Sequence, residues 1–254
     1  MIVTHRDKDH SGGIVAVQEA VPIGRTLSSV AELPGERCLA GQAWEWDGVR
    51  FTMLHPGAGD YAGKAVKTNN MSCVLRVENA SGSALLTADI EARDEQALLL
   101  RSPELLASDV LLVPHHGSST SSTPDFIAAV GARAAIIPVG YRNRFQHPRP
   151  EVVARYANAQ VWRTDRDGAI RVHLANGYRC LPIGWSTAGT GINSDPGVRQ
   201  ERSRGWDGQH GATMQELAVS SPKSNRLPGI LQAVALRFEL GDRSQEAAEA
   251  LPLL

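Results

Sequence analysis

Four potential metal ligands lie within six residues near the start of the chain: His5, Asp7, Asp9 and His10. Imidazole nitrogens and carboxylate oxygens are the usual protein ligands of the divalent cations that catalyse hydrolysis. Their close spacing on a tight turn lets several point at one centre, and adjacent Asp9 and His10 can serve a second cation beside the first. The alternative is a solvated charged turn. A His-x-Asp-x-Asp-His-x-Gly-Gly pattern directly after an apolar pair favours a metal site.

Further potential ligands follow other predicted strands. Asp89 comes after the apolar run 85–88, His115 and His116 come after 111–114, and His147 lies in the loop after 136–139. Because sites in open α/β sheets form at the carboxyl ends of strands, we expect these loops to converge. His55 also follows a predicted strand, and there a structural role is favoured over a place at the border of the site.

Length, net charge, apolar runs and cysteine content limit the kind of protein that this chain can be. The chain has 254 residues and 42% hydrophobic residues, which allows one large domain or a domain plus a tail. A net charge of -1 gives no strong long-range attraction for polyanions, so contact with nucleic acid needs a local basic patch. No signal peptide or membrane-length apolar run is present. The three scattered cysteines predict no disulfide framework, which suits a reducing compartment or a fold that does not depend on its cysteines.

Strands alternate with helices along the first 182 residues, which predicts an α/β fold with a sheet in the middle. The predicted strands are 2–4, 37–39, 44–46, 49–54, 72–77, 84–87, 109–114, 134–139, 160–163 and 169–174, and the predicted helices are 12–20, 91–101, 150–156 and one that starts at Pro124. Asp47-Gly48 predicts a hairpin turn. From about residue 183, a Gly-, Ser- and Pro-rich composition predicts a disordered tail, with weak helical patterns over 230–240 and 244–251.

Taken together, these residues resemble the metallo-β-lactamase fold, and within it the C-terminal hydrolase domain of the ComEC competence proteins, which internalise DNA. The resemblance covers about residues 1–182. It rests on ordered segments at 4–13, 69–75, 85–91, 110–122, 143–148 and 163–168. It implies a metallo-β-lactamase-like αββα sandwich for residues 1–182, with 183–254 as a tail. The family's domain begins with two or more strands and a helix before the metal motif, and a membrane channel precedes it. We therefore expect a chain that lacks the first strands of the domain.

The resemblance also implies a ligand set for two divalent ions. His5, Asp7, Asp9 and His10 match the family's metal loop, Asp89 matches the carboxylate that bridges two ions, and His115 matches a ligand of the second ion, with His116 as the alternative. The wider fold usually has His where this chain has Asp7. An oxygen-rich site shifts the preference from Zn²⁺ towards Mn²⁺ or Mg²⁺, although Zn²⁺ stays possible.

The remaining predicted roles are catalytic and substrate-binding. Asp9, His116 and His147 are the predicted catalytic residues, and Asn70, Ser118, Arg142 and Arg144 are predicted to bind substrate. Guanidinium groups suit phosphate recognition. The alternative, that the arginines are ordinary solvated loop residues, is equally open.

Three functions compete. The first is a metal-dependent nuclease that acts on DNA during uptake, as the resemblance implies. The second keeps the chemistry and changes the substrate to small esters or phosphodiesters. The third is a catalytically silent fragment or interaction module of a DNA-uptake channel. DNA and the membrane-channel portion of a ComEC-like protein are the expected partners. Full-length family members are inner-membrane proteins, and the chain as given is expected to be soluble and cytoplasmic.

Overall fold

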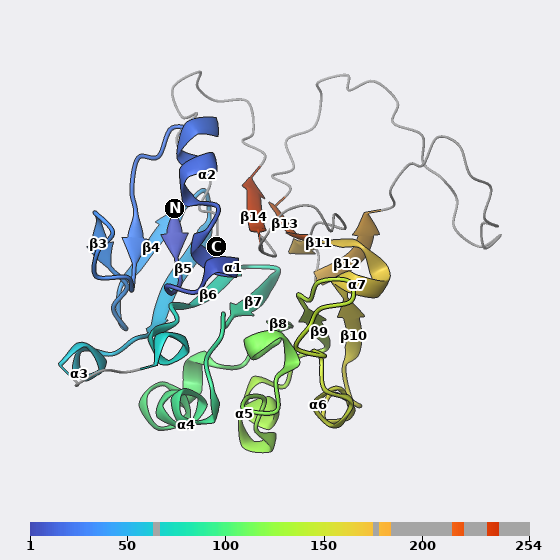
Figure 1. Ribbon diagram of the computed structural model, residues 1–254. Helices are drawn as coiled ribbons and strands as arrows, with labels where there is room; N and C mark the ends of the chain where they lie inside the picture. The colour runs from blue at the N-terminus through green and yellow to red at the C-terminus, as the bar shows by residue number, and fades with distance from the viewer. Residues whose placement is uncertain (63–66, 175–177, 184–214, 221–232, 239–254) are drawn as a thin grey trace, which may run out of the picture.

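A seven-stranded mixed sheet forms the centre of the protein, which a computed structural model describes over residues 1–62, 67–174 and 178–183 and at strands 215–220 and 233–238 (Figure 1). Its strands follow the order β10-β9-β8-β7-β6-β5-β4. Their bounds are Ala43–Trp46 (β4), Val49–His55 (β5), Val74–Asn79 (β6), Gly82–Leu86 (β7), Val110–Leu112 (β8), Ala134–Ile137 (β9) and Gln160–Arg163 (β10). The predicted α/β class is confirmed.

The two halves of this sheet differ in polarity. Strands β4 to β7 pair antiparallel, and strands β7 to β10 pair parallel. The parallel strands β8 and β9 are buried at every position, as expected for strands covered on both faces. The predicted Asp-Gly hairpin joins β4 to β5, and both of its residues have positive φ, 50° at Asp47 and 73° at Gly48.

Two further sheets lie over one face of the central sheet. One is a small parallel sheet of β1 (Ile2–Val3), β2 (Leu27–Ser28) and β3 (Glu36–Arg37). The other has the order β12-β11-β13-β14, with bounds Ala169–Leu174 (β11), Tyr178–Ile183 (β12), Gln215–Ser220 (β13) and Ala233–Phe238 (β14). The hydrophobic core between these layers joins Ile2 of β1 and Val172 of β11 to Phe51 of β5.

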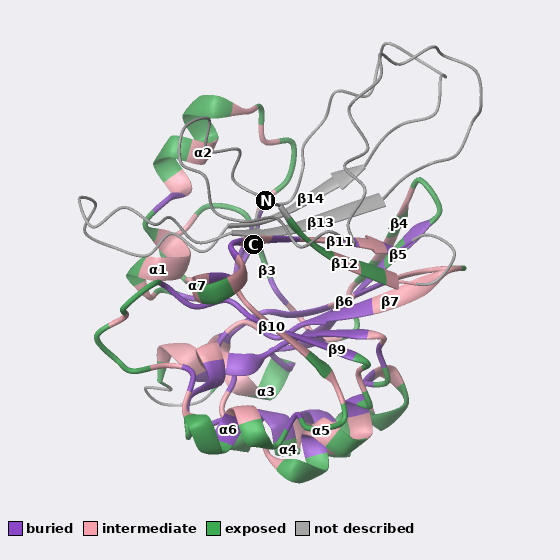
Figure 2. Ribbon diagram, turned by 90° about the vertical axis from the view of Figure 1, so that its right-hand side faces the viewer, coloured by how far each residue is buried: buried purple, intermediate pink, exposed green. Residues whose placement is uncertain are grey.

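Helices cover the other face of the central sheet (Figure 2). A second core joins Leu98 of α4 (Ala92–Arg101), Phe126 of α5 (Pro124–Val130) and Val152 of α6 (Pro150–Ala154) to Leu85 of β7. Neighbouring residues of one strand, such as Leu85 and Leu86, enter opposite cores because strand side chains alternate. This is the layered sheet-and-helix sandwich predicted for a metallo-β-lactamase-like domain.

The remaining helices are short and lie near the ends of strands. They are α1 (Lys8–Ser11), α2 (Ile14–Ala20), α3 (Ala58–Tyr61) and α7 (Thr164–Asp167), with 3-10 turns η1 (Thr68–Met71), η2 (Pro103–Leu105) and η3 (Pro114–Gly117). Within the described residues, no helix is both long enough and apolar enough to cross a membrane.

The expectation of no disulfide is wrong. Cys38 and Cys73 are bonded to each other, with Cα atoms 5.9 Å apart, and Cys180 is free. The two bonded cysteines are 35 residues apart in sequence, so their spacing gave no signal. They meet because the end of β3 and the start of β6 both enter the core between the sheets.

The weak helical pattern over 230–240 is also wrong where the structure describes it. Ala233–Phe238 is strand β14, which pairs antiparallel with β13, and β13 pairs with β11. Pairing with a strand that is distant in the sequence thus overrides the local helical preference. Residues 215–220, within the predicted disordered tail, form strand β13. The rest of the predicted tail, including the second helical pattern over 244–251, lies outside the described residues.

Candidate metal centre

The loops that carry the predicted ligands meet at one edge of the central sheet. Strands β7, β8 and β9 run parallel, so the segments after them emerge on the same side. The backbone joins two of these segments directly, because the His115 N–H donates to the Ala88 carbonyl at 3.0 Å. A second backbone hydrogen bond ties the first loop to the start of β6, because the Cys73 N–H donates to the Thr4 carbonyl at 3.0 Å.

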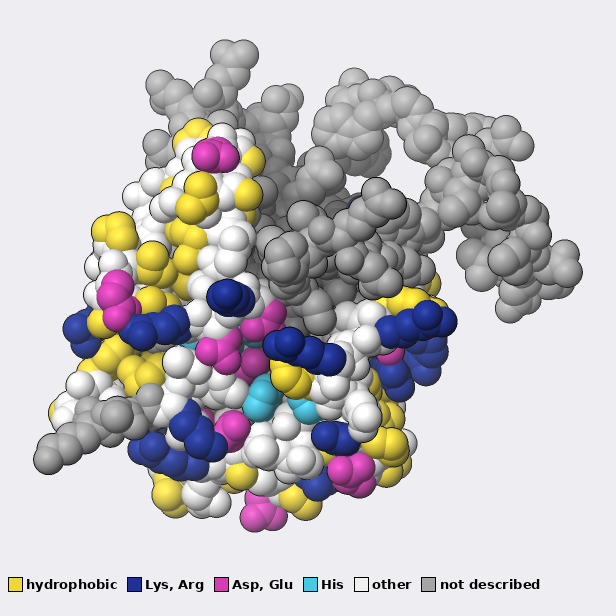
Figure 3. Space-filling view, in the orientation of Figure 1, with side chains coloured by type: hydrophobic (Ala, Val, Ile, Leu, Met, Phe, Trp, Pro, Cys, Tyr) yellow, Lys and Arg dark blue, Asp and Glu magenta, His cyan; other side chains and the backbone are white. Residues whose placement is uncertain are grey.

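Four of these side chains form a compact group: Asp9, His10, Asp89 and His116. Their ligand atoms all lie within 4.8 Å of one another, an arrangement that could hold a metal ion. Asp89 is the centre of the group, with Oδ1 3.2 Å from Nε2 of His10 and Oδ2 3.2 Å from Nε2 of His116. Oδ2 of Asp9 lies 3.3 Å from the same nitrogen of His116. In Figure 3, histidine side chains reach the surface beside acidic ones.

Two more predicted ligands adjoin the group. Nε2 of His5 lies 3.8 Å from Oδ2 of Asp89 and 3.9 Å from Oδ2 of Asp7. Nε2 of His5 is buried and makes no hydrogen bond within the described part of the chain, and Nε2 of His10, also buried, faces the Asp89 carboxylate at 3.2 Å. A buried imidazole nitrogen without a bond is costly unless it meets a ligand. The donor set and these two nitrogens therefore fit a divalent cation.

Three hydroxyl groups orient the ligands, and the sequence analysis missed all three. Oγ1 of Thr4 contacts Nδ1 of His5 at 3.1 Å and Nδ1 of His10 at 3.3 Å. Oγ of Ser72 accepts a hydrogen bond from the Asp89 N–H at 3.2 Å. Thr68 donates to Oδ1 of Asp7 at 2.7 Å. Such partners fix the orientation of metal ligands. The sequence signal was their position: Thr4 directly precedes His5, and Thr68 and Ser72 flank the Asn69-Asn70 pair.

The structure separates the two adjacent histidines. His115 and His116 both have positive φ, 48° and 56°, so their side chains diverge. Nδ1 of His116 lies 2.9 Å from the Pro138 carbonyl, which leaves Nε2 facing the carboxylates. The ring of His115 instead contacts Thr120 at 3.1 Å and the Asn69 amide at 3.2 Å. The geometry favours His116, the alternative in the prediction, over His115 as the ligand.

The electrostatics of the group centre on Asp89. Burial alone would raise the pKa of Asp89, but the imidazoles of His116 and His10 hold it well below its usual range. Conversely, burial would lower the pKa of His116, but the Asp89 and Asp9 carboxylates raise it to about 10. Burial and the neighbouring His10 lower the pKa of His5 to about 4. The carboxylates are thus charged near neutral pH, and His5 is a neutral potential ligand.

His147, a predicted catalytic residue, lies beside the group. Its ring centroid is 5.9 Å from that of His115 and 6.5 Å from that of His116. Burial and the two neighbouring imidazoles lower the pKa of His147 to about 4. Its Nδ1 atom is buried and has no hydrogen-bond partner within the described residues. His147 is therefore a neutral imidazole near the cluster.

The predicted substrate-binding residues fall in different surroundings. Ser118 is buried, and its hydroxyl contacts that of Thr120 at 3.1 Å. The side-chain oxygen of Asn70 is buried without a partner among the described residues. Arg142 and Arg144 are exposed on the loop that also carries His147.

His55 lies beneath the site in a group of its own. It is fully buried, and Nε2 lies 2.9 Å from the Asn70 carbonyl. Nδ1 lies 3.2 Å from the guanidinium of Arg101 and 3.8 Å from Asp60. These contacts fit the structural role that the sequence favoured, because the bond to the Asn70 carbonyl ties His55 to η1.

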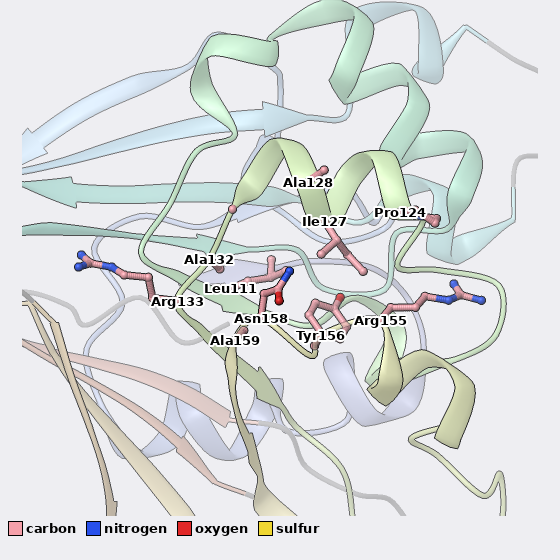
Figure 4. Close-up of a pocket in the computed structure, with 11 residues that line it drawn as sticks. Leu111, Pro124, Ile127, Ala128, Ala132, Arg133, Arg155, Tyr156, Asn158 and Ala159 are labelled. Carbon is pink, nitrogen blue, oxygen red and sulfur yellow. The ribbon is translucent and has the colours of Figure 1, made fainter.

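A separate hollow lies on the helical side of the molecule. It has a volume of about 480 Å³ and is bordered by Ile127 of α5, Leu111 of β8 and Tyr156 after α6 (Figure 4). No predicted site residue lines it. The chemistry predicted from sequence therefore belongs to the edge of the sheet and not to this hollow.

The chain is similar in sequence to known competence proteins. Over 180 residues the chain is 36% identical to competence protein ComA of Neisseria gonorrhoeae, which covers 70% of this chain and 25% of that protein. Over 195 residues it is 32% identical to ComE operon protein 3 of Bacillus subtilis, which covers 69% of this chain and 24% of that protein. The chain thus spans about a quarter of the length of these relatives. No protein-family model matches it.

Among solved structures, the chain is similar to the metallo-β-lactamase fold protein YhfI from Bacillus subtilis. The identity is 13% and the TM-score is 0.40, over 64% of this chain and 73% of that one.

Proposed function

We propose that this homologue of the ComEC-type competence proteins is a metal-dependent hydrolase that cleaves phosphodiester bonds in DNA. The observation that carries the proposal is the group of Asp9, His10, Asp89 and His116, whose ligand atoms lie within 4.8 Å of one another. The buried Nε2 atom of His5, which makes no hydrogen bond among the described residues, supports it, because a folded protein leaves such an atom unsatisfied mainly where something binds.

The ligand set suits two divalent ions, Mn²⁺ or Zn²⁺. Asp9, His10 and His116 would hold one ion, His5 and Asp7 would hold the other, and Asp89 contacts both sets of ligands. Such ions, when bound, supply positive charge that stabilises the charge developing on a phosphoryl oxygen. Three carboxylates in the set favour a hard ion such as Mn²⁺.

The chain's own residues would bind and orient the substrate. Arg142 and Arg144 are exposed on the loop that carries His147 and offer planar donors to phosphate oxygens. Asn70 offers a buried amide oxygen that no protein group satisfies among the described residues. His147, neutral near pH 7, can form a hydrogen bond to the substrate without adding charge. Ser118 positions Thr120, the partner of His115, through their hydroxyl contact.

DNA is the proposed substrate because a two-ion centre with arginines beside it suits a phosphodiester, and because the relatives are named as competence proteins. The membrane-channel portion of a ComEC-type protein is the proposed partner. Small phosphodiesters or esters remain the second candidate substrate class, since a fold does not fix a substrate.

Cleavage of fluorescently labelled DNA with Mn²⁺ tests the proposal. We expect cleavage by the wild-type chain and its loss in Asp9→Ala, while Asp125→Ala, an exposed aspartate on α5, stays active. A folded wild-type protein that cleaves no DNA with Mn²⁺, Mg²⁺ or Zn²⁺ would contradict the proposal. Cleavage of bis(p-nitrophenyl) phosphate without cleavage of DNA would move the substrate to the small phosphodiesters.

A further inference from the structure

The loop at 140–150 presents two exposed aromatic rings beside the metal centre. Tyr141 is 51% exposed and Phe145 is 54% exposed, and the other large exposed hydrophobic side chains in the described residues are aliphatic. A solvent-exposed aromatic ring gains nothing from the core, so a pair of them four residues apart points to a ligand.

Hydrogen bonds within the loop hold these rings in place. The side chain of Asn143 donates to the His147 carbonyl at 2.6 Å and accepts from the His147 N–H at 2.9 Å. The Gln146 N–H donates to the Asn143 carbonyl at 3.3 Å. The rings of Tyr141 and Phe145 are therefore presented by a closed turn.

The ring of Phe145 adjoins the ring of His147, which lies beside the candidate site. Its centroid lies 6.0 Å from that of His147 with only 17° between the planes, and His147 lies 6.5 Å from His116 at 24°. Phe145 and His147 are therefore neighbouring rings with nearly parallel planes, as are His147 and His116, and His116 faces the carboxylates of the cluster. A flat group stacked on Phe145 would lie close to the candidate site.

The charge of the loop selects the kind of flat group. Arg142, Arg144 and Arg149 lie within it, and 140–150 contains no Asp or Glu. The guanidinium of Arg144 lies 4.7 Å from the ring of Phe145, and that of Arg142 lies 5.2 Å from the ring of Tyr141. An exposed cation–π contact is weaker than the stacking of a nucleobase on an aromatic ring. A base can therefore replace the guanidinium, which becomes available to the adjoining phosphate.

We propose that Phe145 and Tyr141, with Arg144 and Arg142, form a stacking platform for unpaired nucleobases beside the metal centre. The platform would make single-stranded nucleic acid, with its bases turned outward, the substrate class of the site. This inference rests on the proposed function and names its substrate. Bases paired in a duplex cannot stack on the rings without being unpaired first.

Fluorescence anisotropy of the full chain in a chelating buffer tests the platform without cleavage. The probes are a labelled thymidine strand, an abasic strand of the same length and a duplex. We expect the wild-type protein to bind the thymidine strand roughly tenfold more tightly than the abasic strand, with the duplex resembling the abasic strand. Phe145→Leu should remove most of this preference, because leucine keeps an apolar side chain without an aromatic face.

Three further variants sharpen the result. Phe145→Tyr should keep the preference, Arg144→Ala should weaken binding to both single strands by similar factors, and Leu100→Ala, which truncates an exposed leucine on α4, should change neither. Equal wild-type affinity for the thymidine and abasic strands, an unchanged preference in Phe145→Leu, or no binding to any probe would overturn the platform. Because binding is measured without metal, a chain that stacks bases but cleaves nothing would refute only the proposed hydrolase activity.

Discussion

Two groups of buried histidines and carboxylates lie on either side of η1, and they differ in how their nitrogens are used. In the candidate metal centre, Nε2 of His5 is buried without a hydrogen bond in the described residues, and Nε2 of His10 faces the Asp89 carboxylate. In the second group, formed by His55, Asp60, Asp94 and Arg101, both ring nitrogens of His55 have partners within the protein. The same residue types therefore produce one centre that is open to a ligand and one that is complete.

The source of positive charge explains the difference. Arg101 lies 3.2 Å from Nδ1 of His55 and also donates to the Leu54 carbonyl, so the second group contains its own cation. The ion pairs of Asp9 and Asp89 in the described residues are all with histidines. Buried carboxylates need compensation by charge. In the metal-free protein the positive charge in the candidate centre comes from His116, whose pKa the Asp89 and Asp9 carboxylates raise to about 10, whereas in the His55 group it comes from the permanent charge of Arg101.

The largest expected effect comes from Asp89→Asn. Asparagine keeps the shape of the side chain but removes the charge that faces three histidines. Since loss of a mere supporting partner weakens metal binding about 10- to 100-fold, loss of this shared carboxylate should weaken it by more than roughly 100-fold. Titration calorimetry with Mn²⁺ measures the effect.

The matched control for this variant is Asp60→Asn, which changes a carboxylate of the His55 group. We expect Mn²⁺ affinity within a few-fold of the wild-type value there. Equal loss of affinity in both variants would mean that the two groups are not distinct in function.

Substitution of His55 should lower the stability of the metal-free protein more than substitution of His5. In metal-free protein, His55→Leu removes the side-chain partner of the buried Asn70 carbonyl and one of the partners of Arg101, and it should destabilise the fold by about 3 kcal/mol. His5→Leu should cost less than about 1 kcal/mol, because Nε2 of His5 has no bond to lose among the described residues and Thr4 and Ser72 keep other partners.

Urea unfolding in a chelating buffer gives both values, and adding Mn²⁺ completes the test. We expect Mn²⁺ to stabilise wild-type protein and His55→Leu but to lose much of its effect on His5→Leu. A larger loss of metal-free stability in His5→Leu than in His55→Leu would contradict the comparison.

The pH dependence of metal-free stability should also separate the groups. The carboxylates raise the pKa of His116 to about 10, so its contribution is complete below about pH 6.5 and is lost as the pH rises towards 10. Burial lowers the pKa of His55, so its group loses stability as the pH falls below about 6.5, where the unfolded chain takes up the proton. Each unit between the two pKa values of a group changes its contribution by up to about 1.4 kcal/mol.

Comparison with His116→Gln and His55→Leu across pH 5 to 10 isolates each contribution. The stability advantage of wild type over His116→Gln should shrink as the pH rises. The advantage over His55→Leu should shrink as the pH falls. The same trend in both pairs would be incompatible with the assigned protonation states.

The convergence of the candidate ligands was easiest to predict where they are adjacent or directly follow strands. That the loop from His5 to His10 lies beside Asp89 needed only local pattern and the rule that parallel strands end at one edge. The choice between His115 and His116 could not be made, because it depends on two left-handed backbone conformations and on the distant Pro138 carbonyl. Likewise, the hydroxyls of Thr68 and Ser72 are orienting groups only because of where η1 packs.

The errors in the fold have the same physical origin. Cys38 and Cys73 meet through the stacking of two sheets, and 233–238 becomes a strand through pairing with β13. Neither depends on local periodicity. By contrast, the buried parallel strands β8 and β9 and the Asp47-Gly48 hairpin were predicted correctly, because length, apolar content and turn chemistry determine them locally.

The number of metal ions bound per chain tests the central claim most directly. Wild-type protein should be stripped with a chelator, loaded with Mn²⁺, freed of excess metal and measured by elemental analysis against protein concentration. Two ions per chain is the predicted result, in line with two sets of ligands that share Asp89. Less than one ion per folded chain would contradict the account and favour a catalytically silent interaction module.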